Sequence, residues 1–113
     1  MQIRHTRGIG SPISILSGTL RDFVIEHRIA EIDYLHVDVQ GDDLNVLKGL
    51  GDKLPMVKKG DVEAASRREV ALYQGQHTLA DVERFLGEHG FEIEHVEPND
   101  DLHNEVVVFF KRR

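Results

Sequence analysis

The sequence contains no cysteine, which excludes disulfide bonds and cysteine-ligated metals. No apolar run is long enough to span a bilayer, and the first residues lack the apolar segment of a signal peptide. Basic residues are outnumbered, because 14 Lys and Arg stand against 20 Asp and Glu and leave a formal net charge of -6. We therefore expect a cytoplasmic protein whose partners include neither nucleic acid nor a membrane.

The chain has 113 residues, of which 40% are hydrophobic and 30% are charged. This length and composition are typical of one globular domain or part of one. No internal repeat or low-complexity segment interrupts it. We expect a lead-in over residues 1–18, with a short edge strand at 12–16, followed by an α/β domain over residues 19–113.

The apolar pattern predicts alternating helices and strands. A threonine followed three residues later by an aspartate, as at Thr19 and Thr78, is typical of a capping box at a helix start. The expected helices cover 19–29, 42–50 and 78–90, and the expected strands cover 32–39, 55–65, 91–97 and 105–111. The strand at 55–65 is the weakest, because residues 58–61 interrupt it and predict a bulge or an early end. Alternation followed by a closing pair of strands predicts a mixed sheet with a C-terminal antiparallel hairpin.

The segment IDYLHVDVQG at 32–41 is the most informative part of the chain. Side chains alternate along a strand, so Leu35 and Val37 share one face, and Tyr34, His36 and Asp38 share the other. A central parallel strand is usually apolar on both faces. The polar face therefore needs a functional reason or an exposed position, and ligands bind beyond the carboxyl ends of parallel strands.

Five motifs, taken in order, resemble the FkbM family of S-adenosylmethionine-dependent methyltransferases. They are TLRD at 19–22, IDYLHVDVQG at 32–41 with VLKG at 46–49, LYQGQ at 72–76, FLGEHGFE at 85–92 and NEVVVF at 104–109. The resemblance implies the later part of a class I methyltransferase (Rossmann-like) sheet, with strands four to seven in the order 4-5-7-6. The family often has lysine where this chain has His36, which puts any lysine-dependent role in doubt.

The resemblance implies the C-terminal region of a methyltransferase that acts on an oxygen or nitrogen of a small molecule or glycan. S-adenosylmethionine is then the cofactor of the complete enzyme, and its binding half, in the same or another chain, is the expected partner. We expect the chain alone to bind no cofactor and to be inactive. The alternative is a non-catalytic α/β interaction module derived from the same fold.

Candidate site residues follow from the carboxyl end of the strand at 32–39. Asp38 is the candidate catalytic residue, because it could position an acceptor or a proton; the alternative is that it caps backbone N–H groups of the 40–43 turn. The candidate substrate-binding residues are His36, Gln40, Gly41, Glu63 and Tyr73. Glu63 is alternatively a surface acid, and Tyr73 alternatively packs over the end of the sheet. We expect no metal, because no HxxxH or HExxH pattern accompanies His36.

The strand at 32–39 would pair with the first strand of the cofactor-binding half. An unpaired strand edge invites association. We therefore expect residues 12–16 to fold back along this edge, or the chain to form a homodimer through it.

Overall fold

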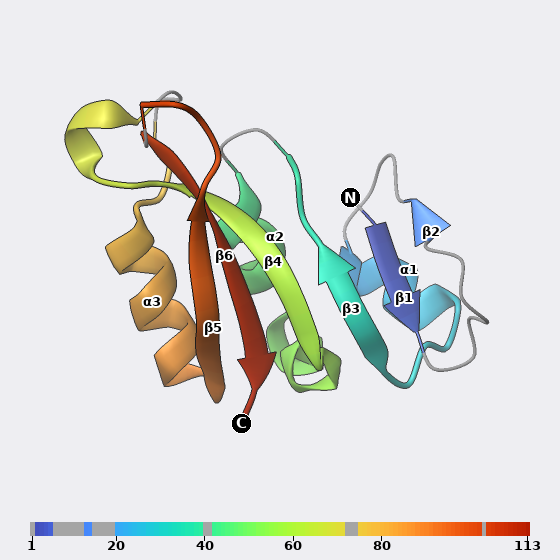
Figure 1. The fold of residues 1–113 in the computed structure, drawn as a ribbon. Coiled ribbons are helices and arrows are strands. Elements are labelled where there is room, and N and C mark those ends of the chain that lie inside the picture. The colour runs from blue at the N-terminus through green and yellow to red at the C-terminus, as the bar shows by residue number, and fades with distance from the viewer. Residues whose placement is uncertain (1, 6–12, 15–19, 40–41, 72–74, 103) are drawn as a thin grey trace.

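The computed structural model describes residues 2–5, 13–14, 20–39, 42–71, 75–102 and 104–113, the first two segments by their backbone alone. The strands are β1 (Gln2–His5), β2 (Ile13–Ser14), β3 (Ile32–His36), β4 (Lys59–Ala65), β5 (Phe91–Pro98) and β6 (Glu105–Arg112). The α-helices are α1 (Leu20–Glu26), α2 (Asp43–Gly49) and α3 (Leu79–Glu88), and two 3-10 helices are η1 (Gly51–Met56) and η2 (Arg68–Val70). Figure 1 shows their arrangement.

These strands form one sheet in the order β2-β1-β3-β4-β6-β5 (Figure 1). β3 and β4 pair in parallel, and every other neighbouring pair is antiparallel. The α/β fold class and the C-terminal antiparallel hairpin are confirmed. The predicted order of the four later strands is confirmed as well, because β6 inserts between β4 and β5.

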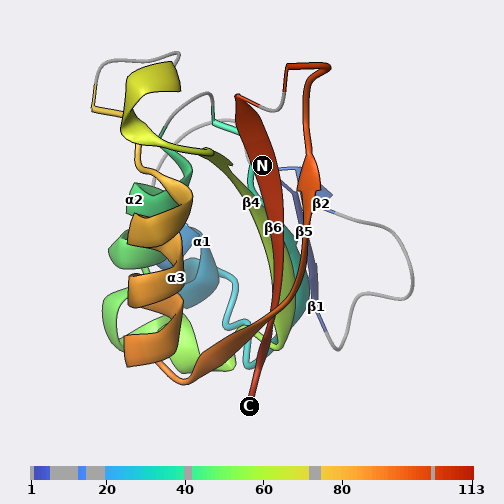
Figure 2. The same cartoon turned by 60° about the vertical axis from the view of Figure 1, so that its left-hand side comes forward.

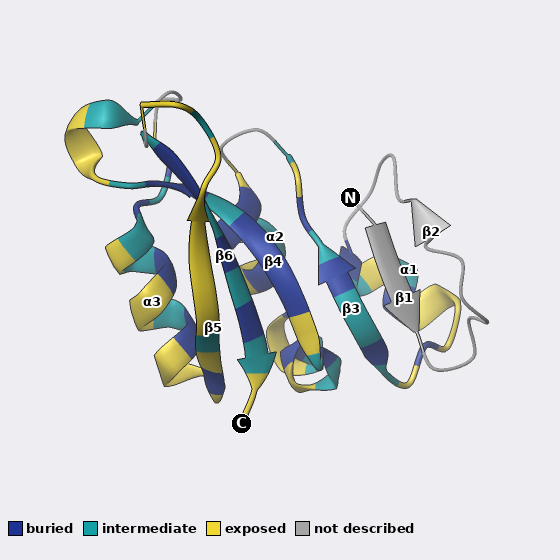
Figure 3. Ribbon diagram, viewed as in Figure 1, coloured by how far each residue is buried: buried dark blue, intermediate teal, exposed yellow. Residues whose placement is uncertain are grey.

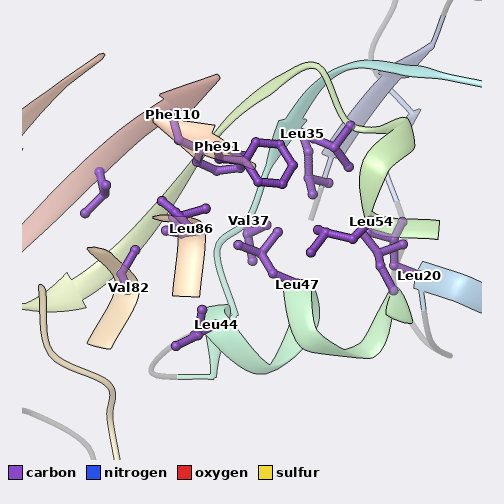
Figure 4. Close-up of a cluster of buried hydrophobic side chains, with 14 of the residues drawn as sticks. Leu20, Leu35, Val37, Leu44, Leu47, Leu54, Val82, Leu86, Phe91 and Phe110 are labelled. Atoms are coloured by element: carbon purple, nitrogen blue, oxygen red, sulfur yellow. The ribbon is translucent and has the colours of Figure 1, made fainter. Parts of the chain in front are cut away.

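All three α-helices lie on one face of the sheet (Figure 2). Leu35 and Val37 are fully buried beneath them, as the alternation along β3 predicts. They meet Leu44 and Leu47 of α2, together with Leu86 of α3, in one apolar cluster (Figure 4). The opposite face of β5 is largely exposed (Figure 3). The polar face of β3 therefore lies on the side of the sheet that no described helix covers.

The expectation for the edge of β3 is wrong in its choice of segment. Of residues 12–16 the structure describes Ile13–Ser14, which do not pair with β3; β1 does, in antiparallel register from Gln2↔His36 to His5↔Ile32. Ile13–Ser14 then pairs with β1 on its outer side. Residues 2–5 show no period over their short length, so the sequence predicts only a lead-in there. A homodimer through the edge of β3 stays a prediction.

The expectation for the fourth strand is partly wrong. β4 begins at Lys59 rather than near residue 55, because residues 51–56 form η1 with Pro55 inside it. Proline lacks the N–H group that a strand donates to its neighbour. The bulge expected within residues 58–61 is absent, since β4 pairs with β6 without a register shift from Lys59 to Ala65.

Gly60 explains why the interrupted segment is still a strand. A Cβ atom at this position would lie 2.5 Å from the Leu35 carbonyl oxygen and 2.7 Å from Phe110. The absence of a side chain lets β3 and the Phe110 ring approach β4 closely. This close approach sets the position of β3 beside β4, and with it the position of the polar residues described below.

Helix α3 begins with the predicted capping box. Thr78 Oγ1 accepts from the Asp81 N–H at 3.2 Å, and the Asp81 carboxylate accepts from the Thr78 N–H at 2.9 Å. The backbone N–H bond also lowers the pKa of Asp81, with Arg68 contributing further. The other predicted capping box begins at Thr19, which lies outside the described residues.

Candidate functional site

The candidate site lies where β3 and β4 end at the same edge of the sheet. The pairing continues one step past β3, because the Val37 N–H donates to the Asp61 carbonyl oxygen at 3.1 Å. Asp38 follows and is exposed, whereas Glu63 of β4 is partly buried. Parallel strands bring their carboxyl ends to one edge, so the sequence prediction that Asp38 and Glu63 share an edge agrees with this arrangement.

Asp43, the first residue of α2, holds this edge together. The residue is 2% exposed, and its carboxylate accepts from the backbone N–H of Val39 at 3.0 Å and of Glu63 at 2.8 Å. Burial raises the pKa of Asp43, although the two backbone bonds oppose that rise. Asp43 thus joins the backbone after β3 to the backbone of β4. The alternative role of Asp38, capping the 40–43 turn, stays a prediction, because residues 40–41 lie outside the described residues.

A second carboxylate, Glu105 of β6, lies beside Glu63. The side-chain amide of Asn99 donates to Glu105 Oε1 at 2.8 Å and to Glu63 Oε1 at 3.3 Å. Gln76, which is 2% exposed, donates to the other oxygen of Glu105 at 3.1 Å. These amides fix Glu105 without giving it a positive partner, so the edge keeps a negative charge.

Among the carboxyl groups at this edge, Glu63 has the most strongly shifted pKa. Burial is the largest cause, and the negative charges of Asp38, Glu105 and Asp43 add to it, raising the pKa of Glu63 to about 7. A carboxyl group that titrates near neutral pH beside a strand end is a candidate for ligand or proton handling.

Three side chains meet on the uncovered face of the sheet, close to the same edge. Asp61 of β4 lies opposite His36 in the parallel register. Its Oδ2 accepts from the Tyr34 hydroxyl at 2.5 Å, and its Oδ1 lies 2.6 Å from His36 Nδ1. Asp61 is buried, whereas 43% of the His36 side chain is exposed.

The predicted site residues divide into two groups. Asp38, His36 and Glu63 lie at or next to the carboxyl edge of β3 and β4. Gln40, Gly41 and Tyr73 lie outside the described residues. Sequence reasoning missed Asp43, Asp61 and Glu105. A usable signal for Asp61 was its spacing from Glu63, because two acids at alternate positions share one face of a strand.

No cluster of three or more His, Asp or Glu side chains in the described residues could hold a metal ion. Likewise, none of the helices that the structure describes is long and apolar enough to cross a membrane.

Comparison with models of known protein families identifies the family of this chain. Residues 9–93 match the family described as the methyltransferase FkbM domain. This match covers most of the chain and includes β3, α2, β4 and α3. Neither a curated protein nor a solved structure matches the sequence. The strand order and the family match agree, and the chain belongs to the methyltransferase FkbM domain family.

Proposed function

We propose that this chain forms the acceptor-binding part of an S-adenosylmethionine-dependent methyltransferase, which methylates an oxygen or nitrogen of a small molecule or glycan. The proposal is supported chiefly by Asp38 and Glu63, which flank one strand edge in a chain of the FkbM domain family. The carboxyl edge of parallel strands is where ligands bind in this class of fold.

The chemistry of the edge suits a hydroxyl or amine acceptor. Ionised carboxylates accept hydrogen bonds, and hydroxyl and amine groups donate them. Asp38 is exposed and therefore accessible, while Glu63 changes its charge near neutral pH. Asp43 is not available to an acceptor, because its carboxylate is buried against two backbone N–H groups. In this proposal Asp38 and Glu63 hold the acceptor at the strand end.

The cofactor is assigned to a separate binding half, in the same or another chain. S-adenosylmethionine carries a carboxylate besides its cationic sulfonium and ammonium groups, and the carboxylate side chains of this edge are acceptors that offer that carboxylate no donor. Among the glycines whose surroundings are described, Gly60 alone sits where a Cβ would clash, and it faces Leu35 and Phe110 inside the sheet. The described residues thus do not fit a complete cofactor site.

Methyl transfer tests the proposal directly. The complete protein that the gene encodes is incubated with S-adenosylmethionine carrying a labelled methyl group and with sets of glycan and small-molecule acceptors. We expect labelled product, and we expect D38N to lower kcat/KM by about 100-fold, mainly through KM, because it weakens acceptor binding. D101N, which alters an exposed acid in the β5–β6 turn, is the matched control and keeps wild-type kinetics.

Two results would count against the proposal. Unchanged kinetics in D38N would remove Asp38 from the acceptor site. A complete protein that transfers no label to any acceptor, yet forms a stable stoichiometric complex with a partner protein, would favour the non-catalytic interaction module.

The assignment of the cofactor to a separate binding half is tested by itself. Calorimetric titration of the 113-residue chain with S-adenosylmethionine is expected to give no saturable binding, because the acidic edge lacks a place for the cofactor carboxylate. A one-to-one isotherm with a micromolar Kd would instead place the cofactor site within this chain.

A further inference from the structure

The Tyr34–Asp61–His36 cluster has a geometry that the proposed acceptor site does not use. Asp61 comes from β4, and both of its carboxylate oxygens are engaged by side chains of β3, at 2.5 Å from the Tyr34 hydroxyl and 2.6 Å from His36 Nδ1. Only 8% of the Asp61 side chain is exposed, against 43% for His36. The carboxylate is therefore the buried end of the cluster, and the imidazole is the end that solvent or a ligand reaches.

The hydrogen bonds determine which histidine nitrogen is basic. An ionised carboxylate only accepts hydrogen bonds, so His36 Nδ1 donates its proton to Asp61. A neutral imidazole with its proton on Nδ1 has its lone pair on Nε2. No described residue bonds to Nε2. Asp61 thus fixes the ring in the tautomer whose free nitrogen is a proton acceptor.

The same arrangement stabilises the ring after it takes a proton. A buried carboxylate next to Nδ1–H orients an imidazole and offsets the charge of the imidazolium that forms, which is the role of the acid in an Asp–His pair. Tyr34 holds the second oxygen of Asp61, so the carboxylate cannot rotate away. A purely structural histidine would satisfy Asp61 equally well with its ring covered, whereas the His36 ring is accessible.

We infer that His36 is the general base that takes the proton from the acceptor, with Asp61 and Tyr34 as positioning residues. This inference rests on the proposed function and assigns one of its roles. The acceptor O–H bond breaks, its electron pair stays on the oxygen, and the proton bonds to His36 Nε2. The imidazolium is paired with Asp61 and later returns the proton to solvent, which reaches the ring. Asp38, exposed two residues beyond His36 at the strand end, holds the acceptor beside it.

The first test reads the tautomer and needs no activity. Nitrogen NMR of the complete protein, labelled with ¹⁵N in its histidines, is expected to show His36 protonated on Nδ1 when neutral. D61N removes the carboxylate and is expected to shift the population towards the Nε2-protonated form. Y34F keeps the carboxylate and is expected to keep the wild-type tautomer. An Nε2-protonated ring in the wild type would overturn the inference.

The second test reads the chemical step. H36N retains an N–H donor near the position of Nδ1, so it preserves the bond to Asp61 while removing the base. We expect it to lower kcat about 100-fold or more with little change in KM. In H36G, added imidazole is expected to restore part of the lost rate. D38N, by contrast, acts mainly on KM.

The outcomes separate this inference from the proposed function. A wild type that methylates an acceptor, with H36N at full kcat and H36G unaffected by imidazole, overturns the role of His36 alone. A wild type without methyl transfer overturns the proposed function and this inference together. Rescue of H36G by imidazole, with the Nδ1-protonated tautomer in the wild type, establishes it.

Discussion

Glu63 is the residue whose charge couples the candidate site to the stability of the fold. In the unfolded chain its carboxyl group has the ordinary pKa of 4.5, and in the folded chain burial raises the pKa to about 7. Between these two pH values the folded protein keeps a proton that the unfolded chain releases. Raising the pH through this window therefore favours unfolding, and the loss is complete above the folded pKa.

Glu63→Gln removes this pH dependence. The amide stays neutral, so we expect the free energy of unfolding of the variant to fall less than that of the wild type between pH 5 and 8. At pH 8 the variant is expected to be more stable by about 1 kcal/mol, because one pKa unit corresponds to about 1.4 kcal/mol and the partial exposure of Glu63 reduces the effect.

Urea unfolding at several pH values measures the difference between the two proteins. Glu83→Gln, at an exposed position of α3, is the control and is expected to follow the wild-type curve. Parallel curves for Glu63→Gln and the wild type would contradict the raised pKa.

The carboxylates of the edge also show how far sequence reasoning reaches at this scale. Alternation along β3 correctly places Tyr34 and His36 on the polar face, because period-2 geometry requires no knowledge of neighbours. The choice of Asp43 as the backbone-binding acid depends on how α2 packs against β4, which alternation does not encode. Asp61 was overlooked because its role arises only when β4 lies in register with His36.

At the scale of elements, the close approach of β3 to β4 depends on Gly60. Gly60→Ala places a methyl group against the Leu35 carbonyl and the Phe110 ring, both inside the sheet. We expect this substitution to destabilise the fold by about 3 kcal/mol, because well-packed interiors accommodate an added methyl poorly. For a domain of this size that loss lowers Tm by roughly 10 to 20 °C.

Gly49→Ala is the matched control, since a methyl group there has nothing within 4 Å. Gly49 ends α2, so alanine is expected to be neutral or to stabilise by up to about 1 kcal/mol through helix propensity. Calorimetry of the two variants compares them directly. Equal Tm values would show that the packing around Gly60 relaxes without cost.

Long periodic elements were predictable, and short or context-dependent ones were not. Helix α3 follows from its capping box and its apolar positions at Val82 and Leu86. β6 follows from its apolar run, and the hairpin follows from the turn at Pro98–Asp101. β1 has only four residues, and it is a strand because it pairs with β3. That pairing depends on the tertiary fold and not on the local sequence. The apolar residues of η1 also fit a strand pattern, so the pattern alone does not distinguish a 3-10 helix from a strand there. Pro55 is the residue that disfavours the strand.

At the scale of the whole molecule, β1 makes β3 an interior strand. We expect the β3 amides that point away from β4 to be protected from hydrogen exchange, because β1 pairs with that edge. Ile3→Pro removes a backbone N–H from β1, which has β2 on one side and β3 on the other. The substitution therefore removes a hydrogen bond to one of these two strands. The variant is expected to lose protection in β3.

Exchange measured by NMR, together with light scattering for oligomeric state, gives the readout. An exposed β3 edge invites association. We therefore expect the homodimer predicted from the sequence to be more populated in the Ile3→Pro variant than in the wild type. Free exchange of those amides in a stable wild-type monomer would contradict the pairing of β1 with β3.

The parallel junction between β3 and β4 is much shorter than the antiparallel ladders beside it. It consists of Leu35↔Gly60, His36↔Asp61 and one isolated bridge, Ile32↔Val57, whereas β4 and β6 pair over seven residues. Among the junctions between β1 and β5, tension applied across the sheet would therefore separate the strands at this one first. The contacts of Tyr34 and His36 with Asp61 also connect β3 to β4. A force that separates these two strands would therefore remove Asp61 from His36, while β4, β6 and β5 stay paired.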